Sequence, residues 1–379
     1  MNFKSVITIF CFAVLLGCNA EFQTPVSNEN ATLELTRLDG TPIPSPAMDE
    51  FLLSKMEELQ IPGLSVAVIS KGDISYLRSF GVVRADTAEP VGPETVFEAA
   101  SISKAVFAYF VMTMVEDGTL DLDRPMHEYL PLPELEHDER YRSITARMAL
   151  SHQTGLPNWR FLEEDGKLDI KFDPGTEFGY SGEAYEYLVA VVAHLNGVTP
   201  RTLEDVFQER VAVPLEMTHS SFTRNAHWDA HKAYGHEAGV AEEDRWYTDL
   251  SVFGGAHSLH SNAEDLAKFA LAVIEGRGLE PDTYAEMLSE QVVLPDDQPI
   301  RTSFGIESWA LGFGRSSTEA GMKYAHGGVN EHANAYFMVI PAQGYGVVFF
   351  ANSSNGLALA EELEGFLGVL AGSSERSEG

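Results

Sequence analysis

Ser101 and Lys104 are the residues whose types and spacing first suggest chemistry. They lie three positions apart near the start of Phe97–Met114, a largely apolar run that is typical of a buried helix. Residues at this spacing occupy neighbouring surfaces of a helix. The positive end of the helix dipole stabilises charge developing on the hydroxyl, and together with burial it favours the neutral lysine amine. A neutral amine beside a hydroxyl accepts its proton, so the pair predicts an activated serine nucleophile.

The same pair also has a purely structural interpretation. A serine at this place caps a helix, and a lysine extends its charged end out of an apolar surface. A Ser-x-x-Lys match is expected by chance roughly once in a chain of this size and composition. The stretch by itself therefore leaves both interpretations open.

The elements that must position this pair are strands near both chain ends. Leu64–Ser70 and Ile74–Val83 are β-rich and joined by a Gly-Asp turn, which predicts a hairpin. Two further β-rich runs, Ala333–Pro341 and Gly344–Ser354, are separated by a turn. Apolar residues at helical spacing flank these strands in Met48–Leu59 and in Leu357–Leu370.

Helical patterns dominate the middle of the chain. One predicted helix begins at the capping box Ser261–Glu264. We therefore predict an α/β (α+β) fold with one antiparallel sheet, built from both chain ends, flanked by helices and interrupted by a mostly helical lobe. The expected sheet lobe covers about 33–93 and 302–371, and the helical lobe about 94–301. The cleft between such lobes is the expected ligand site.

Several ordered motifs carry a resemblance to a known family. They include ASISK, ALSHQTGLP, FDPGTEFGYSGEAYEYL, WALGFG and HGGVNEHANAYFMVIP. Together they resemble the serine β-lactamase-like superfamily, in the branch of class C β-lactamases, D-alanyl-D-alanine carboxypeptidases and related esterases. The similarity runs from about Met48 to Leu370. It implies a β-lactamase/penicillin-binding-protein-like fold, an acyl-enzyme on Ser101, and no cofactor.

The second family motif, Tyr-x-Asn, corresponds here to Tyr180-Ser181-Gly182. By resemblance, Tyr180 is the phenolate or hydrogen-bond partner that works with Lys104 to move the proton of Ser101 and then to activate the deacylating water. A tyrosine has an ordinary pKa of about 10, so acting as a base requires positive neighbours.

The third family motif, Lys-Thr-Gly or His-x-Gly, corresponds to His326-Gly327-Gly328. The resemblance places His326 on a strand that lines the cleft, where it would supply a tunable positive charge near Tyr180. The backbone N–H groups of Ser101 and Val329 would form the oxyanion hole. Gly327 and Gly328 would let the backbone approach the substrate closely.

Two departures from the family pattern affect the expected substrate. Glycine replaces the asparagine of the second motif at Gly182 and the threonine of the third at Gly327. Both substitutions favour an esterase-like hydrolase of small acyl esters with an open acyl site. The alternatives are a D-amino-acid peptidase or carboxypeptidase, a weak β-lactamase, a transesterase, and a non-catalytic binding module of the cell envelope.

Charge limits the partners of the chain. There are 57 acidic and 25 basic residues, for a net charge of −32. This balance argues strongly against nucleic-acid binding, and it also argues against docking on anionic lipid through charge. The expected partner is a small-molecule or peptidyl acyl substrate. His227 and His231 have the i, i+4 spacing of metal ligands, but no His-Glu-x-x-His arrangement accompanies them, and we expect no metal.

The N-terminus has the pattern of an export signal. Lys4 precedes the apolar run Val6–Leu16, which is too short to span a bilayer. Leu15–Cys18 (LLGC) resembles a bacterial lipobox, which predicts a signal peptide over 1–17, lipid attachment at Cys18 and a tether over 18–32. The alternative is secretory cleavage after Ala20. We expect anchorage at the periplasmic face of the cell envelope, with membrane contact only through this lipid, and a disordered tail over 372–379.

Cys11 and Cys18 are the only cysteines, and both lie in this N-terminal region. A disulfide framework and a catalytic thiol in the folded body are therefore excluded.

Overall fold

The computed structural model describes residues 26–27, 34–242 and 249–370. The predicted signal peptide, Cys18, nearly all of the predicted tether and the tail over 372–379 lie outside the described residues. Among the described helices, none has the length and apolar character needed to cross a bilayer.

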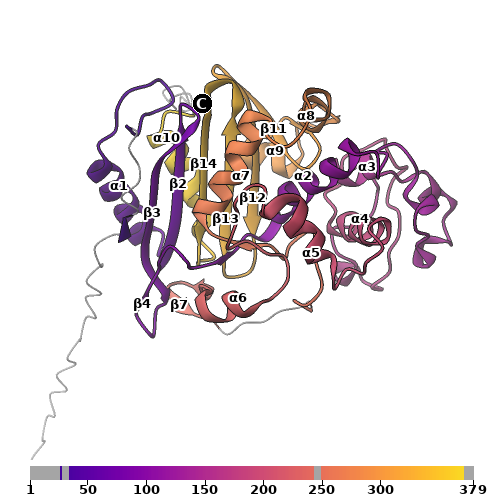
Figure 1. The fold of residues 1–379 in the computed structure, drawn as a ribbon, viewed down its shortest axis with the longest axis horizontal. Coiled ribbons are helices and arrows are strands. Elements are labelled where there is room, and N and C mark those ends of the chain that lie inside the picture. The colour runs from indigo at the N-terminus through magenta and orange to yellow at the C-terminus, as the bar shows by residue number, and fades with distance from the viewer. Residues whose placement is uncertain (1–25, 28–33, 243–248, 371–379) are drawn as a thin grey trace, which may run out of the picture.

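A large antiparallel sheet forms the centre of the molecule (Figure 1). Its strands follow the order β1-β3-β2-β14-β13-β12-β11-β10-β9, with β4 beside β3. β2 and β14 are neighbours, in a register that pairs Val66 with Phe349, so the two chain ends meet inside one sheet as predicted. Every residue of β2, β13 and β14 is buried, because packed layers cover both faces of the central strands. The central strands are β2 (Gly63–Ser70), β3 (Asp73–Arg84), β12 (Gly321–Val329), β13 (Asn334–Ile340) and β14 (Tyr345–Ala351).

The remaining strands are short. β1 (Val26–Ser27), β4 (Glu89–Pro90), β9 (Val292–Val293), β10 (Ser308–Trp309) and β11 (Gly314–Thr318) complete the main sheet. Two small ribbons lie apart from it, β5 (Phe97–Glu98) with β8 (His260–Ser261), and β6 (His236–Glu237) with β7 (Val240–Ala241).

The first and last helices cover one face of the sheet, as the sequence predicts. α1 (Ser45–Glu58) and α10 (Leu359–Phe366) share an apolar core with Val66, Val68 and Phe349 of the sheet. This face is completed by the ring stack of Phe51 on Phe366, whose centroids lie 4.2 Å apart.

α7 (Ala263–Glu275) covers the opposite face of the sheet (Figure 1). Its N-cap is Asn262, whose side chain accepts from the Asp265 N–H, one residue beyond the predicted cap at Ser261. The sequence assigned this segment to the helical lobe, but α7 packs on β2 and β14. An amphipathic pattern fixes which side of a helix is buried without fixing which partner covers it.

The helical lobe lies beside the sheet (Figure 1). Its central helix, α2 (Ser103–Glu116), is buried on nearly all sides, and Phe107 and Phe110 contact the other aromatic residues of the lobe. The other helices are α3 (Ala146–Leu150), α4 (Gly182–Leu195), α5 (Leu203–Phe207), α6 (Ala226–His231), α8 (Pro281–Leu288) and α9 (Pro299–Phe304).

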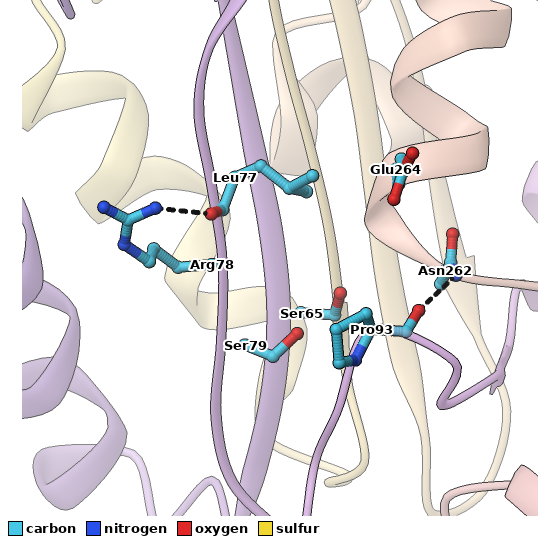
Figure 2. Close-up of a pocket in the computed structure, with 7 residues that line it drawn as sticks. All are labelled: Ser65, Leu77, Arg78, Ser79, Pro93, Asn262 and Glu264. Atoms are coloured by element: carbon cyan, nitrogen blue, oxygen red, sulfur yellow. Dashed lines mark hydrogen bonds between the residues drawn. The ribbon is translucent and has the colours of Figure 1, made fainter. Parts of the chain in front are cut away.

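A small cavity lies between the β2–β3 hairpin and the start of α7 (Figure 2). It is lined by Ser65, Ser79 and Asn262, among others, and Asn262 donates to the Pro93 carbonyl at its edge. Its volume of about 20 Å³ is enough for one water molecule and too small for a substrate. The substrate site must therefore be sought elsewhere.

Candidate active site

Ser101 lies in the tight turn Ala100–Ile102, immediately before α2. Ala100 has a φ of 46°, a left-handed conformation that is costly for a residue with a side chain. Ser103 holds this turn, because its Oγ donates to the Ala100 carbonyl at 2.6 Å and accepts from the Leu259 N–H at 3.0 Å. The local strain is thus balanced by buried hydrogen bonds, as is common at functional sites.

Lys104 is buried directly beneath Ser101, with 1% of its surface exposed. Its Nζ lies 3.3 Å from Ser101 Oγ and donates to the Ala256 carbonyl at 2.8 Å. No carboxylate among the described residues forms a salt bridge with it. Burial lowers the pKa of Lys104 to about 7, against a smaller opposing effect of Glu186. A large fraction of the amine is therefore neutral near pH 7, with a lone pair available to Ser101.

Tyr180 forms the wall beside this pair. Lys104 Nζ lies 4.8 Å from the centroid of its ring. Packing around the phenol raises the pKa of Tyr180 above its ordinary value, and a hydrogen bond with the Ser101 side chain opposes that rise. The ring is therefore a neutral phenol at neutral pH. Of the two roles expected for Tyr180, this state fits a hydrogen-bond partner rather than a standing phenolate.

His152 supports the Tyr180 segment from below. It is fully buried, its Nδ1 accepts from the Ser181 N–H at 3.1 Å, and its ring lies 4.2 Å from that of Tyr180 between centroids. Burial lowers the pKa of His152 well below its usual value, so the imidazole is neutral. It serves as a rigid support for the second motif.

His326 lies on β12 near Tyr180, with 6.2 Å between the ring centroids. The expected positive charge is wrong, because burial, reinforced by Lys104, lowers the pKa of His326 to about 3. Nδ1 lies 2.8 Å from the Gly327 carbonyl, which can only accept, so Nδ1 carries the proton. Nε2 is a buried acceptor without a protein partner among the described residues.

The end of β12 beyond His326 forms an edge beside the Ser101 turn. The pairing of β12 with β11 ends at Ala325, while its pairing with β13 continues to Val329. A Cβ on Gly328 would lie 2.3 Å from the Ala99 carbonyl, so glycine is required for this close approach. Val329, the last residue of β12, is 59% exposed and lines the same cleft as Ser101, which is described below.

Gly327 and Gly182, the glycines that depart from the family pattern, differ in the space around them. A Cβ on Gly327 would make only an ordinary contact with Leu357 at 3.6 Å, so this position is open, as expected. A Cβ on Gly182 would lie 2.6 Å from the Trp159 ring and 2.9 Å from the Asn158 carbonyl. The expected open space at residue 182 is therefore wrong, because a neighbouring indole fills it.

These residues belong to one cleft of about 1350 Å³. The cleft runs from the Ser101 turn along β12 towards α10. Lys104 and Gly328 are not among the residues that line it. Cys18, the predicted lipid site, is outside the described residues. The predicted site residues that line the cleft are Ser101, Tyr180, His326, Gly327 and Val329.

Sequence reasoning missed three members of this site. The Ala256 carbonyl orients the Lys104 amine, Trp309 contacts the rings of both His152 and His326, and Asn158 lines the cleft. Trp309 is the first residue of the WALGFG motif, and Asn158 directly follows ALSHQTGLP. Their positions in or beside these family motifs could have identified them as site residues.

The histidines with metal-ligand spacing have other contacts. The rings of His227 and His231 are 4.5 Å apart, and His227 Nε2 lies 3.0 Å from the Glu94 carbonyl. Within the described part of the chain, no group of three or more His, Cys, Asp or Glu side chains is arranged to hold a metal ion.

Comparisons with known proteins agree with this geometry. A family model described as Beta-lactamase matches residues 48–369. The chain is 22% identical over 330 residues to Protein flp of Staphylococcus aureus (strain MRSA252), covering 80% of this chain and 62% of that protein. It is 25% identical over 337 residues to Penicillin-binding protein 4 of Amycolatopsis lactamdurans, covering 83% and 87% of the two chains. The chain thus spans about three fifths of the length of Protein flp.

Two solved structures show the same fold. One is an octameric penicillin-binding protein homologue from Pyrococcus abyssi, with a TM-score of 0.69, 23% identity, and coverage of 85% of this chain and 78% of that one. The other is a class C beta-lactamase, with a TM-score of 0.70, 19% identity, and coverage of 86% and 96%.

Proposed function

The chain belongs to the beta-lactamase family, and from this premise we propose that it is a serine hydrolase that cleaves small, uncharged acyl esters through an acyl-enzyme on Ser101. The arrangement of Ser101, Lys104 and Tyr180 supports the chemistry. The charge of the cleft supports the choice of substrate.

In the proposed acylation step, Ser101 Oγ attacks the ester carbonyl while its proton passes to Lys104 Nζ. The backbone N–H groups of Ser101 and Val329 stabilise the oxyanion. When the tetrahedral intermediate collapses, the leaving alkoxide takes a proton through Tyr180, whose neutral phenol can donate and accept in one step. Water then attacks the acyl-enzyme, its proton returns along the same path, and the acid is released.

The observation that carries the ester proposal is the charge of the cleft. Lys323 is the only lysine or arginine among the described residues that line it, and both oxygens of Glu364 lie within 3.2 Å of its Nζ. Glu361 adds negative charge, whereas Glu362 is paired with Lys55 at 3.1 Å. β-Lactams and D-alanyl peptides carry a carboxylate, and here it would meet acidic side chains without an unpaired cation. A neutral ester avoids this cost.

A D-amino-acid peptidase or weak β-lactamase is the second candidate. It is favoured by the names of similar proteins, a penicillin-binding protein and a class C beta-lactamase. Both candidates share the acyl-enzyme and differ in the substrate that forms it.

The test is to incubate the purified protein with an active-site fluorophosphonate, short p-nitrophenyl esters, nitrocefin and a D-Ala-D-Ala peptide. We expect labelling and ester turnover that vanish in Ser101→Ala and persist in Ser303→Ala, which removes another hydroxyl from the same cleft. Labelling that survives in Ser101→Ala would contradict the nucleophile. Turnover of nitrocefin or the peptide above that of the esters would favour the second candidate, and a folded protein without any turnover would favour a binding module.

We also propose that the chain is exported and anchored through lipid on Cys18 at the periplasmic face of a bacterial membrane. The LLGC sequence supports this. Several acyl chains on one cysteine suffice for stable anchorage, whereas one chain is marginal. Processing of the precursor should be sensitive to globomycin and lost in Cys18→Ala. Normal processing of that variant would instead favour cleavage after Ala20.

A further inference from the structure

The proposed oxyanion hole is assembled from two separate parts of the chain. One N–H donor belongs to Ser101, in the turn before α2, and the other to Val329, the last residue of β12. Such donors stabilise an oxyanion only when both reach the same oxygen, at about 2.7–3.1 Å. The end of β12 must therefore be fixed relative to the Ser101 turn.

The backbones of these two parts meet at Gly328 and Ala99. A Cβ on Gly328 would lie 2.3 Å from the Ala99 carbonyl and 3.4 Å from the Ala100 Cβ. This packing prevents the end of β12 from coming any closer to the turn. A directional hydrogen bond is needed to keep the two parts from moving apart.

A side-chain hydrogen bond beside this packing contact joins the same two parts. Asn330 directly follows Val329, and its Nδ2 donates to Glu98 Oε2 at 2.5 Å. Because an ionised carboxylate only accepts, the bonded atom of the carboxamide is its nitrogen. Glu98 lies three residues before Ser101. Hydrogen bonds to an ionised acceptor are roughly twice as strong as neutral ones, so this contact is suited to hold the two parts together.

The backbone around each partner of this hydrogen bond is itself held. Glu98 lies in β5, which pairs with β8, and the Ala99 N–H donates to the Leu259 carbonyl at 2.8 Å. Asn330 begins the turn between β12 and β13, and its N–H closes that turn by donating to the Ala333 carbonyl at 2.9 Å. Both Glu98 and Asn330 are half-buried. The contact therefore joins two ordered segments rather than two loose side chains.

We propose that Glu98 and Asn330 are positioning residues of the reaction, and that their hydrogen bond sets the separation of the two oxyanion-hole donors. Neither side chain is among those that line the cleft, so both act through the backbone that carries the N–H groups of Ser101 and Val329. This inference rests on the proposed ester hydrolysis and names what holds its oxyanion hole in place.

The test compares p-nitrophenyl acetate with its thionoester, in which sulfur replaces the carbonyl oxygen. Sulfur is a weak hydrogen-bond acceptor, so the thionoester gains little from an oxyanion hole. The two kcat/KM values are each divided by the uncatalysed hydrolysis rate, which removes the difference in intrinsic reactivity. We expect the full-length protein to prefer the oxygen ester by about 10²-fold or more.

Asn330→Asp is the main variant, because it removes the donor and places a second carboxylate against Glu98. The preference for the oxygen ester should fall about ten- to hundredfold, while the thionoester rate changes little. The double variant Glu98→Gln with Asn330→Asp exchanges donor and acceptor across the contact and should restore most of the preference. Glu331→Gln removes an exposed carboxylate from the same turn and should leave the preference unchanged.

An unchanged preference in Asn330→Asp would overturn the positioning role. So would an equal loss for the two esters, which is the effect of general structural damage, or a lost preference that the double variant does not recover. Equal use of the two esters by the unmodified protein would overturn the oxyanion hole on which the inference depends. These results differ from a failure of the ester proposal itself, in which neither ester is turned over or turnover survives in Ser101→Ala.

Discussion

Two buried lysines of this protein have opposite surroundings. Lys104 and Lys323 are 1% and 7% exposed, and both lie near the same cleft. Lys323 Nζ lies 2.9 Å from Glu364 Oε2, and Tyr336 also donates to that carboxylate. Lys104 instead has a carbonyl and a serine hydroxyl as its nearest polar neighbours.

The difference shows how burial yields a base in one place and a structural pair in the other. A buried ammonium needs a carboxylate to remain charged. Without one, desolvation lowers the pKa of Lys104 to about 7, so the amine can take a proton from Ser101. Lys323 pairs with the Glu364 carboxylate and so joins β12 to α10.

The largest expected effect is the loss of activity in Lys104→Met. Removing the proton acceptor should lower kcat/KM for a p-nitrophenyl ester by about 10²–10⁴-fold, the usual contribution of a general base. Lys323→Met, assayed below its melting temperature, is the matched control and should retain most of the activity. Comparable losses in both variants would remove the functional distinction between the two lysines.

The next effect is on stability, and it should fall on the other lysine. Lys323→Met leaves Glu364 buried without a cation and should cost about 3–5 kcal/mol in the free energy of unfolding measured by urea titration. Replacing both partners, with Lys323→Met and Glu364→Leu, should recover most of that loss. If Lys323→Met alone is as stable as the unmodified protein, the structural role of the Lys323–Glu364 pair is contradicted.

Lys104→Met should have a much smaller effect on stability, within about 1 kcal/mol of the unmodified protein or in its favour. Burying the Lys104 amine costs free energy, and the amine is retained because the reaction needs it. Methionine has a similar length and is apolar, so it removes this cost. The same urea titration tests this. A loss as large as that of Lys323→Met would mean that Lys104 is held mainly by stabilising contacts.

The smallest predicted effect comes from Glu186→Gln. Glu186 opposes the lowering of the Lys104 pKa, and its Oε1 accepts from the Ala256 N–H at 3.1 Å. The amide keeps an acceptor oxygen but removes the charge, so the acid limb of the kcat/KM profile should move to lower pH. A move to higher pH would show that Glu186 acts on Lys104 in another way.

The sequence predicted the parts of this account that depend on nearby residues. The Ser101–Lys104 spacing, the β2–β3 hairpin and the strands near both chain ends are local patterns, and the structure confirms their elements. The charge state of His326 was wrong because burial depends on the packing of Trp309 and Tyr180 around it. The filling of the Gly182 site by Trp159 was missed for the same reason, since residues distant in sequence meet there only after folding.

The pH dependence of the reaction of Ser101 with a fluorophosphonate tests the central claim most directly. The rate of labelling by a fluorophosphonate reports nucleophile activation without a later deacylation step. Below the pKa of Lys104 the amine is protonated and cannot accept a proton, so the rate should fall about tenfold for each pH unit. Above it, the rate should become constant. We predict an inflection near pH 7 that disappears in Lys104→Met. An inflection near pH 10, or one that persists in that variant, would contradict Lys104 as the neutral base.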